Sequence, residues 1–288
     1  MNVRLLSTAA LLGVLAASGA AFAADIVEPA YEEIAEPAPL STAGWYLRGD
    51  VGYAFKSKNE GDWDFYNQYP GVEGIDDTHH FKSLDLDGTA SFGGGLGYRF
   101  TDQLRADATV DYFKADVSGE TPCPFMVKTA PEGLALPYDA ECDLKGSTKA
   151  SVWTAMANAY VDIGQFGPIN PYIGAGIGAA HVKYDDYNED QVCGEPFSCP
   201  YTGKHEGMGS WRFASSLMAG ATVDLTQQLK LDAGYRYTRI EDGDAHGYDA
   251  ADKDAGASGV QLRDNGFDVH TLRAGLRYEF GGGAGFGY

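Results

Sequence analysis

The chain has 288 residues and a formal net charge of −20 at pH 7, with 38 Gly, 14 Phe and 18 Tyr. The acidic balance excludes a general nucleic-acid-binding surface, which needs a basic footprint. We therefore expect no nucleic acid among its partners. The many glycines and aromatic residues favour a β-rich fold with numerous turns.

The N-terminal segment has the three parts of a secretory signal peptide. Arg4 precedes a mostly apolar run over 5–17, and a small-residue A-x-A pattern ends at Ala23. This order predicts a signal peptide over 1–23 that is cleaved before Ala24. A buried N-terminal helix is the alternative, and it is disfavoured because the run has no polar face.

The segment that follows, residues 24–43, is acidic and contains prolines. Because it can bury little apolar surface, we interpret it as a flexible periplasmic linker. No later segment offers the roughly 18 consecutive apolar residues that a membrane-spanning helix needs. A mature chain that lies in a membrane must then cross it as a closed β-barrel, which also satisfies every backbone polar group in lipid.

From residue 44 onward the sequence alternates between apolar and polar residues, the period of a β-strand. Eight such segments can be read, at about 44–55, 88–100, 104–112, 151–163, 171–184, 211–225, 229–238 and 267–280. They predict an all-β fold, an eight-stranded antiparallel up-and-down transmembrane β-barrel over residues 44–280. The facing of the fifth strand stays open, because Ile173, Ala175 and Ile177 alternate with glycines and both faces read as apolar.

The connections between these strands alternate sharply in length. Three are short, at about 101–103, 164–170 and 226–228, and four are long, at about 56–87, 114–150, 185–209 and 240–266. Short periplasmic turns and long extracellular loops are typical of barrels in the bacterial outer membrane, and an even strand count returns both ends to the periplasm. We therefore expect the mature protein to lie in the bacterial outer membrane.

The polar faces of the predicted strands carry charges of both signs. An eight-stranded barrel is so narrow that inward charges must pair rather than line an open channel. The alternative is a water-soluble barrel with these charges outside, but aromatic residues at the strand ends favour membrane interfaces. The predicted lumen charge network consists of Arg48, Asp50, Arg105, Asp107, Asp111, Asp162, Arg212, Asp224, Asp232, Arg236, Arg273, Arg277 and Glu279.

The four cysteines fall into two close pairs. An exported protein experiences oxidising conditions, so we predict the local disulfides Cys123–Cys142 and Cys193–Cys199. A zinc site is the alternative, and it is disfavoured because the spacing lacks C-x-x-C and no histidine lies beside both pairs.

The long loops are rich in Asp and Glu, and two interpretations of these carboxylates remain. One is that they hold Ca²⁺ or Mg²⁺ through oxygen ligands and bridge to lipopolysaccharide phosphates, and the other is that they are solvated. Solvation is preferred because no EF-hand spacing is present, so we expect neither metal nor cofactor. His79, His80, His205 and His246 lie in loops, and His181 and His270 lie in strands, with no recognisable Ser/His/acid arrangement. We therefore expect that the protein is not an enzyme.

Three segments carry a resemblance to a known family. Residues 44–53, 171–178 and 273–280 resemble the small outer-membrane barrel proteins and surface antigens related to the OmpA membrane domain. The last octapeptide is similar to the pattern that this family presents to the barrel-assembly machinery, which implies an assembly signal at Gly275, Tyr278 and Phe280. A Gly-rich tail, 281–288, follows where the family usually stops, and no peptidoglycan-binding domain follows the barrel.

The resemblance and the charged inner faces together suggest a function. We expect a structural and surface-interaction protein whose barrel sits among outer-membrane lipids, while its disulfide-tied loops contact lipopolysaccharide or host or phage surface ligands. A small porin is the alternative, and it ranks lower because inward charges of both signs favour a plug. An outer-membrane lipid- or peptide-acting hydrolase is the third hypothesis.

Overall fold

The computed structural model describes residues 43–67, 74–129, 136–137, 139–199 and 201–280. The predicted signal peptide with Ala23 and Ala24, most of the linker and the tail 281–288 lie outside these residues. No helix in the described part of the chain is long and apolar enough to span a bilayer.

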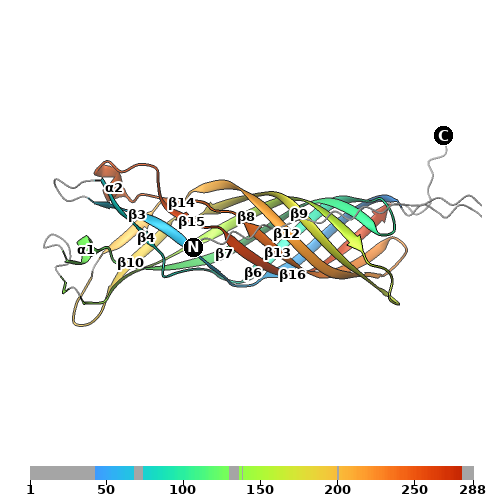
Figure 1. The fold of residues 1–288 in the computed structure, drawn as a ribbon, viewed down its shortest axis with the longest axis horizontal. Helices are drawn as coiled ribbons and strands as arrows, with labels where there is room; N and C mark the ends of the chain where they lie inside the picture. Colours follow the sequence, from blue (N-terminus) through green and yellow to red (C-terminus); the bar gives the residue numbers. More distant parts are fainter. Residues whose placement is uncertain (1–42, 68–73, 130–135, 138, 200, 281–288) are drawn as a thin grey trace, which may run out of the picture. The chain divides into compact units, whose positions relative to one another are not determined.

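Eight long antiparallel strands form a closed ring (Figure 1). Each pairs with its neighbours in the order β8-β9-β12-β13-β16-β1-β6-β7, and β7 pairs back to β8. The predicted eight-stranded barrel is therefore confirmed. The wall strands are β1 (Gly44–Ala54), β6 (Thr89–Arg99), β7 (Leu104–Pro122), β8 (Cys142–Asp162), β9 (Ile169–Tyr184), β12 (Gly209–Asp224), β13 (Leu229–Ile240) and β16 (Phe267–Phe280).

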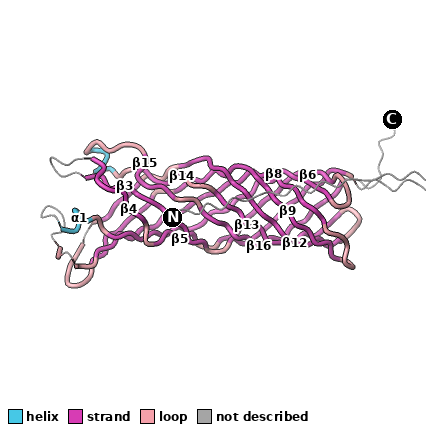
Figure 2. Tube along the Cα trace, in the orientation of Figure 1, coloured by secondary structure: helices cyan, strands magenta, loops and turns pink. Residues whose placement is uncertain are grey.

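The four long connections are more ordered than the loops that the sequence analysis expected (Figure 2). We call them together the crown. Their position on the extracellular side, with the short turns in the periplasm, stays the prediction of the sequence analysis, and the two ends of the barrel are named accordingly. Their elements are β2 (Ser57–Asn59), β3 (Gly61–Asn67), β4 (Gly74–His80), β5 (Ser83–Leu86), α1 (Phe125–Thr129), β10 (Tyr187–Cys193), β11 (Thr202–His205), β14 (Gly243–Gly247), α2 (Ala250–Asp254) and β15 (Val260–Asp264).

Alternation along the wall strands decides which side chains fill the lumen. In β1, Tyr46, Arg48 and Asp50 are buried, whereas Trp45 and Leu47 are exposed on the outer face. An exposed apolar outer face is the surface that a lipid bilayer covers.

The facing of β9 is resolved by the same criterion. Ile173 and Ile177 are 54% and 62% exposed on the outer face, while Tyr172 is buried in the lumen. The alternating glycines of β9 line the lumen beside large inward side chains. At Gly174, for example, an added Cβ would lie 2.6 Å from the ring of Tyr160.

The polarity of the two faces inverts partway along β7. Below Tyr112 the strand points Asp107 inward and apolar residues outward, but beyond it Phe113 and Val117 point inward and Lys114 outward. The predicted end of this strand near Tyr112 was wrong, because the strand continues to Pro122 with its polar face reversed. A barrel wall surrounded by water buries apolar side chains inside, so the inversion marks the level where β7 leaves the lipid.

The neighbouring strands invert at corresponding positions. In β8, Val152 points inward while Lys149 points outward, and in β9, Val182 points inward while Lys183 points outward. Lys114 aligns with Ser151 of β8, and Ser151 aligns with Lys183 of β9. The boundary therefore runs across three adjacent strands.

Above this boundary the lumen is closed by an apolar core. Side chains of the wall meet side chains that the crown contributes, which the sequence analysis did not foresee. The members include Phe113, Val117, Val152, Val182, Ala214, Ile240, Phe267 and Val269 from the wall, and Leu84, Leu86, Ala245 and Leu262 from the crown.

Candidate functional site: the filled lumen and the crown

The first cluster of lumen charges centres on Arg48. Its Nε and Nη2 donate to the Asp50 carboxylate at 2.9 and 2.6 Å, and its Nη1 donates to Asp107 Oδ2 at 3.1 Å. The Tyr46 hydroxyl also donates to Asp107 Oδ2, at 3.1 Å. A buried guanidinium is tolerated when carboxylates surround it in this way, and removing one partner is strongly destabilising.

A second cluster surrounds Asp111. Arg236 Nη1 donates to one carboxylate oxygen at 2.7 Å, and Arg273 Nη2 donates to the other at 2.6 Å. Arg273 Nη2 also lies 3.3 Å from Asp50 Oδ2. This last contact joins the two clusters across the lumen.

A third group lies closer to the periplasmic turns. Arg105 Nε lies 3.3 Å from Asp162 Oδ1, and its guanidinium carbon lies 4.2 and 4.7 Å from the ring centres of Tyr160 and Tyr172. Cation–π contacts of this kind gain strength where water is excluded. The rings of Tyr160 and Tyr172 therefore help to stabilise the Arg105 guanidinium, whose contact with the Asp162 carboxylate is long.

Two further ion pairs lie beside this third group. Arg277 Nε lies 3.3 Å from Asp232 Oδ2, and Arg99 Nη2 donates to Glu279 Oε1 at 2.7 Å. The sequence analysis did not include Arg99 in the network. Its inward position, shared with Ser91 and Gly93, was the available signal.

Two of the predicted network residues lie elsewhere. Asp224 is exposed at the periplasmic end of β12, where it pairs with Lys230 at 2.6 Å, because the strand ends there and its side chain reaches water. Arg212 lies at the opposite end of the same strand and pairs with the crown residue Asp264. Both departures correct the prediction of one continuous lumen network.

The lumen charges leave little free space. A cavity lined by Arg48, Asp50 and Asp232 has a volume of about 10 Å³. A second, lined by Asp111, Arg236 and Arg273, has about 30 Å³. A single water needs about 10–15 Å³ by this measure, so each cavity holds at most a few waters.

The crown has its own four-stranded sheet, in the order β14-β15-β3-β4. It joins the first and fourth long connections, with Trp63 aligned to Leu262. On the other side of the crown, β10 pairs with β8 and with β11, which extends the wall sheet outward. Trp63 packs against the apolar core of the lumen and also against the cysteine cluster.

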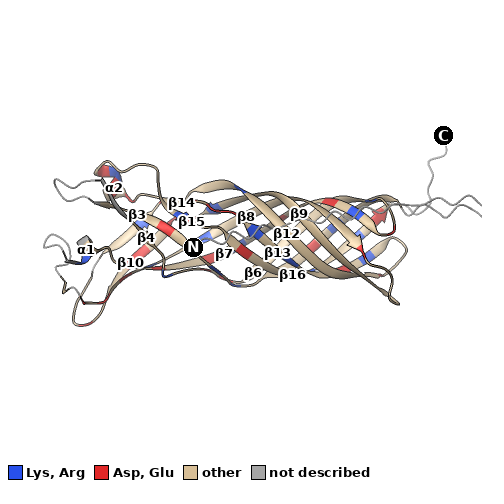
Figure 3. Cartoon of the chain, viewed as in Figure 1, with Lys and Arg blue, Asp and Glu red and all other residues tan. Residues whose placement is uncertain are grey.

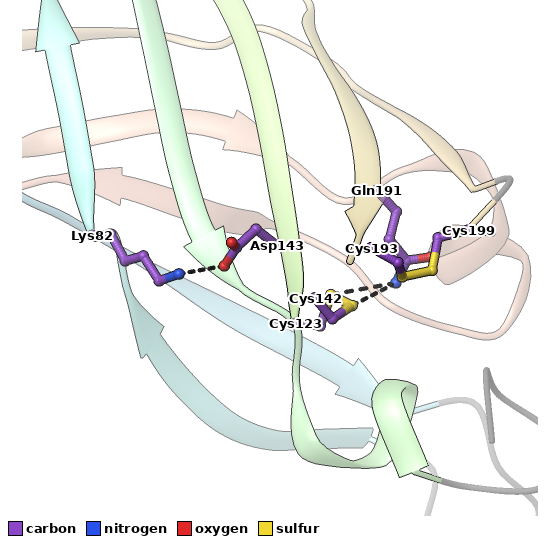
Figure 4. Close-up of a disulfide and its surroundings, with 7 residues drawn as sticks. All are labelled: Lys82, Cys123, Cys142, Asp143, Gln191, Cys193 and Cys199. Carbon is purple, nitrogen blue, oxygen red and sulfur yellow. Dashed lines mark hydrogen bonds and ion pairs between the residues drawn. A yellow bond between two sulfur atoms is a disulfide. The ribbon is translucent and has the colours of Figure 1, made fainter. Parts of the chain in front are cut away.

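The four cysteines form two disulfides at the tip of this extension (Figure 4). Cys123 is bonded to Cys142 and Cys193 to Cys199, and Cys142 aligns with Cys193 across β8 and β10. The structure thus has the local pairs rather than the alternative zinc site, and none of the described cysteines is free. The Gln191 amide lies 3.5 Å from both sulfurs of the first disulfide.

The acidic residues of the crown do not all have the same role. Several lie at the surface as the sequence analysis expected, and Asp186 is an example: hydrogen bonds from Lys204 and the Gly207 N–H hold its pKa below the usual value. Asp264, in contrast, is buried. Arg212 Nη1 and Nη2 donate to its two oxygens at 2.6 and 2.7 Å, and the Tyr184 hydroxyl donates to Oδ2 at 2.8 Å.

Two crown histidines have shifted pKa values of opposite sign. Burial lowers the pKa of His246 to about 4, and its Nε2 lies 3.1 Å from the Asp185 carbonyl oxygen. For His205, burial lowers the pKa but the Glu189 carboxylate raises it more, so the net shift is upward. His246 therefore acts as a neutral link between the third and fourth long connections at pH 7.

The remaining predicted residues lie apart from these clusters. His181 lies beside Trp211 on the outer face, with ring centres 4.9 Å apart, and His270 lies beside Tyr235. In β16, Tyr278 and Phe280 point outward with ring centres 5.2 Å apart, while Gly275 faces Asp50 in the lumen. Their role as an assembly signal stays a prediction, as does the absence of enzyme activity.

The sequence of this chain is similar to those of known proteins. A family model described as outer membrane protein beta-barrel domain matches residues 7–280. A protein of Brucella melitensis is 51% identical over 281 residues, which cover 94% of this chain and 96% of that protein. A Rickettsia bellii protein named as a candidate adhesin is 27% identical over 237 residues, which cover 82% of this chain and 87% of that protein.

Solved structures of similar proteins include the outer membrane protein OprG from Pseudomonas aeruginosa, with a TM-score of 0.43 at 17% identity over 83% of this chain and 97% of that one. Neisserial surface protein A gives a TM-score of 0.38 at 17% identity over 83% of this chain and 99% of that one. Because the family model spans all eight wall strands, the chain belongs to the outer membrane protein β-barrel family and is an outer-membrane protein.

Proposed function

We propose that this protein is a surface-interaction protein in which a filled barrel anchors the crown for contact with ligands outside the cell, such as host or phage surfaces. The observation that carries the proposal is the order of the crown. Its own sheet, two disulfides and the buried Arg212–Asp264 pair hold it on the wall. Binding residues placed on a rigid scaffold lose less conformational entropy when a ligand binds.

The lumen supports the same proposal over the porin alternative. The ion clusters around Arg48 and Asp111 fill the periplasmic half, and the apolar core fills the half below the crown. Purified protein in a planar bilayer is expected to show no stable openings. Sustained single-channel conductance would overturn the closed-lumen part of the proposal and favour transport.

A binding assay tests the surface role directly. In the test variant, a short Gly-Ser turn replaces residues 187–205, which removes β10, β11 and the Cys193–Cys199 disulfide but leaves the eight wall strands. Bacteria that display this variant should attach to host cells, or adsorb phage, less than bacteria that display the wild type. Asp242→Asn, an exposed change in another crown segment, is the control. Heat-modifiable migration on gels verifies that the barrel is folded in each strain. Equal attachment by the wild type, the test variant and the control would then contradict the proposal.

A further inference from the structure

Outward-facing lysines gather where the wall leaves the lipid on three neighbouring strands. On β7, β8 and β9, Tyr112, Trp153 and His181 align across the strands on the outer face. One step farther from the periplasm, the aligned residues are Lys114, Ser151 and Lys183. On each strand, the polar residue thus lies two positions from the ring residue, on the side away from the periplasm. This is the level of the lipid headgroups.

The charges in this row are not all satisfied by the protein. Lys114 Nζ lies 2.8 Å from Asp185 Oδ2, and Lys149 pairs with Asp116. Lys183 is exposed and forms no ion pair with any residue that the structure describes. One ammonium group is therefore left with its charge available beside the Ser151 hydroxyl.

The apolar part of the same surface is also exposed. Trp153 is 50% exposed, and its ring centre lies 4.6 Å from that of Tyr112. Below this ring row, the outer faces of β7, β8 and β9 carry no Asp, Glu, Lys or Arg down to the periplasmic turns. Rings at the interface with cations directly above them match a molecule that has acyl chains below and phosphates above.

We propose that the surface formed by Tyr112, Trp153, His181, Lys114, Ser151 and Lys183 binds a phosphorylated glycolipid of the outer leaflet. The acyl chains would lie along the uncharged faces of β7, β8 and β9, and a sugar phosphate would contact Lys183 and Ser151. Charge complementarity is the argument for this occupant, because the surrounding crown is acidic and repels phosphates that are not held by cations. The proposal deepens the membrane side of the proposed function and does not depend on the ligand of the crown.

Binding of lipid A to the purified full-length protein tests this proposal. The probes are bisphosphorylated lipid A, lipid A without phosphates, and phosphatidylglycerol, and native mass spectrometry measures the bound fraction in detergent micelles. Lys183→Ala should weaken binding of bisphosphorylated lipid A about fivefold, and Lys114→Ala/Lys183→Ala should weaken it further. Lipid A without phosphates should bind the wild type and Lys183→Ala equally weakly.

Lys145→Ala is the matched control. Lys145 also faces outward on β8 and pairs with Glu120 at 3.1 Å, but it lies about 20 Å along the strand from Ser151, farther from the proposed lipid surface. Its loss should leave lipid binding unchanged. The proposal is wrong if Lys183→Ala binds as well as the wild type, if Lys145→Ala has the same effect, or if phosphatidylglycerol binds as tightly as bisphosphorylated lipid A. These outcomes are independent of attachment through the crown, so the two proposals can fail separately.

Discussion

Replacement of Asp264 by Asn tests how the crown is held on the barrel. Asp264 comes from β15, and its two oxygens accept from Arg212 of β12 at 2.6 and 2.7 Å. The side chains of Arg212 and Asp264 are 0% and 1% exposed. Asp264→Asn keeps the shape of the side chain but leaves the Arg212 guanidinium buried without a counter-charge.

The expected cost follows from that burial. Removing one partner of a buried ion pair costs about 3–5 kcal/mol, and the lower value applies here because Asn can still accept one hydrogen bond. About 3 kcal/mol corresponds to a roughly hundredfold rise in the local opening constant. The effect should be confined to the fourth long connection, since the wall strands keep their own hydrogen bonds.

Amide hydrogen exchange measures this opening. Peptides covering β14 and β15 should exchange about a hundredfold faster in Asp264→Asn, while peptides of β1 and β16 stay unchanged. Asp242→Asn, which removes an exposed charge from the same connection, should exchange like the wild type. Arg212→Met/Asp264→Leu should recover much of the protection, because it removes both charges. Wild-type exchange in Asp264→Asn, or no recovery in the double variant, would refute the reasoning.

Three further predictions concern other contacts. Because the native pKa of His246 is about 4 and the unfolded value is 6.5, the unfolded segment binds more protons, so protection of β14, corrected for intrinsic exchange, should fall by about 2 kcal/mol between pH 7 and pH 5. His246→Phe should remove this dependence, and an unchanged pH profile would contradict the assignment. Replacing Cys123 and Cys142 by Ser should lower crown stability in denaturant by about 1 kcal/mol more than replacing Cys193 and Cys199, because the first disulfide separates residues by 19 positions and the second by 6; equal effects would count against this account. Gly275→Ala places a Cβ 2.7 Å from the Gly49 carbonyl oxygen and should reduce the folded fraction on heat-modifiable gels, whereas Ala274→Val on the outer face should not.

The wall of the barrel could be predicted from the sequence because its signal is local. Alternation at Arg105 and Asp107 sets the inward face from neighbouring residues alone, and short turns set the order of the strands. The facing of β9 could not be decided in this way, since Ile173 and Gly174 are both compatible with lipid. The structure distinguishes the two faces, because Tyr172 packs against Tyr160 in the lumen while Ile173 is exposed.

The crown could not be predicted because its contacts join distant segments. Asp264 was grouped with solvated loop carboxylates, and its partner Arg212 lies 52 residues away. The apolar core above the ion clusters did leave a local signal, since Phe113 and Val117 continue the inward parity of Asp111. That signal was missed because the strand was predicted to end near Tyr112, where the inward residues cease to be polar.

The polarity inversion of β7, β8 and β9 also sets how deep the protein sits in the membrane. If the barrel moved toward the periplasm by the length of two strand residues, Lys114 and Lys183 would enter the hydrocarbon layer. If it moved outward, the apolar outer faces just below Tyr112, Trp153 and His181 would leave the bilayer and meet water. Both displacements are opposed. The inward one buries lysines, at a cost that reaches about 2–4 kcal/mol for each lysine at the bilayer midplane, and the outward one exposes apolar side chains to water. The barrel is therefore held at one depth, and the crown stands at a constant height above the cell surface.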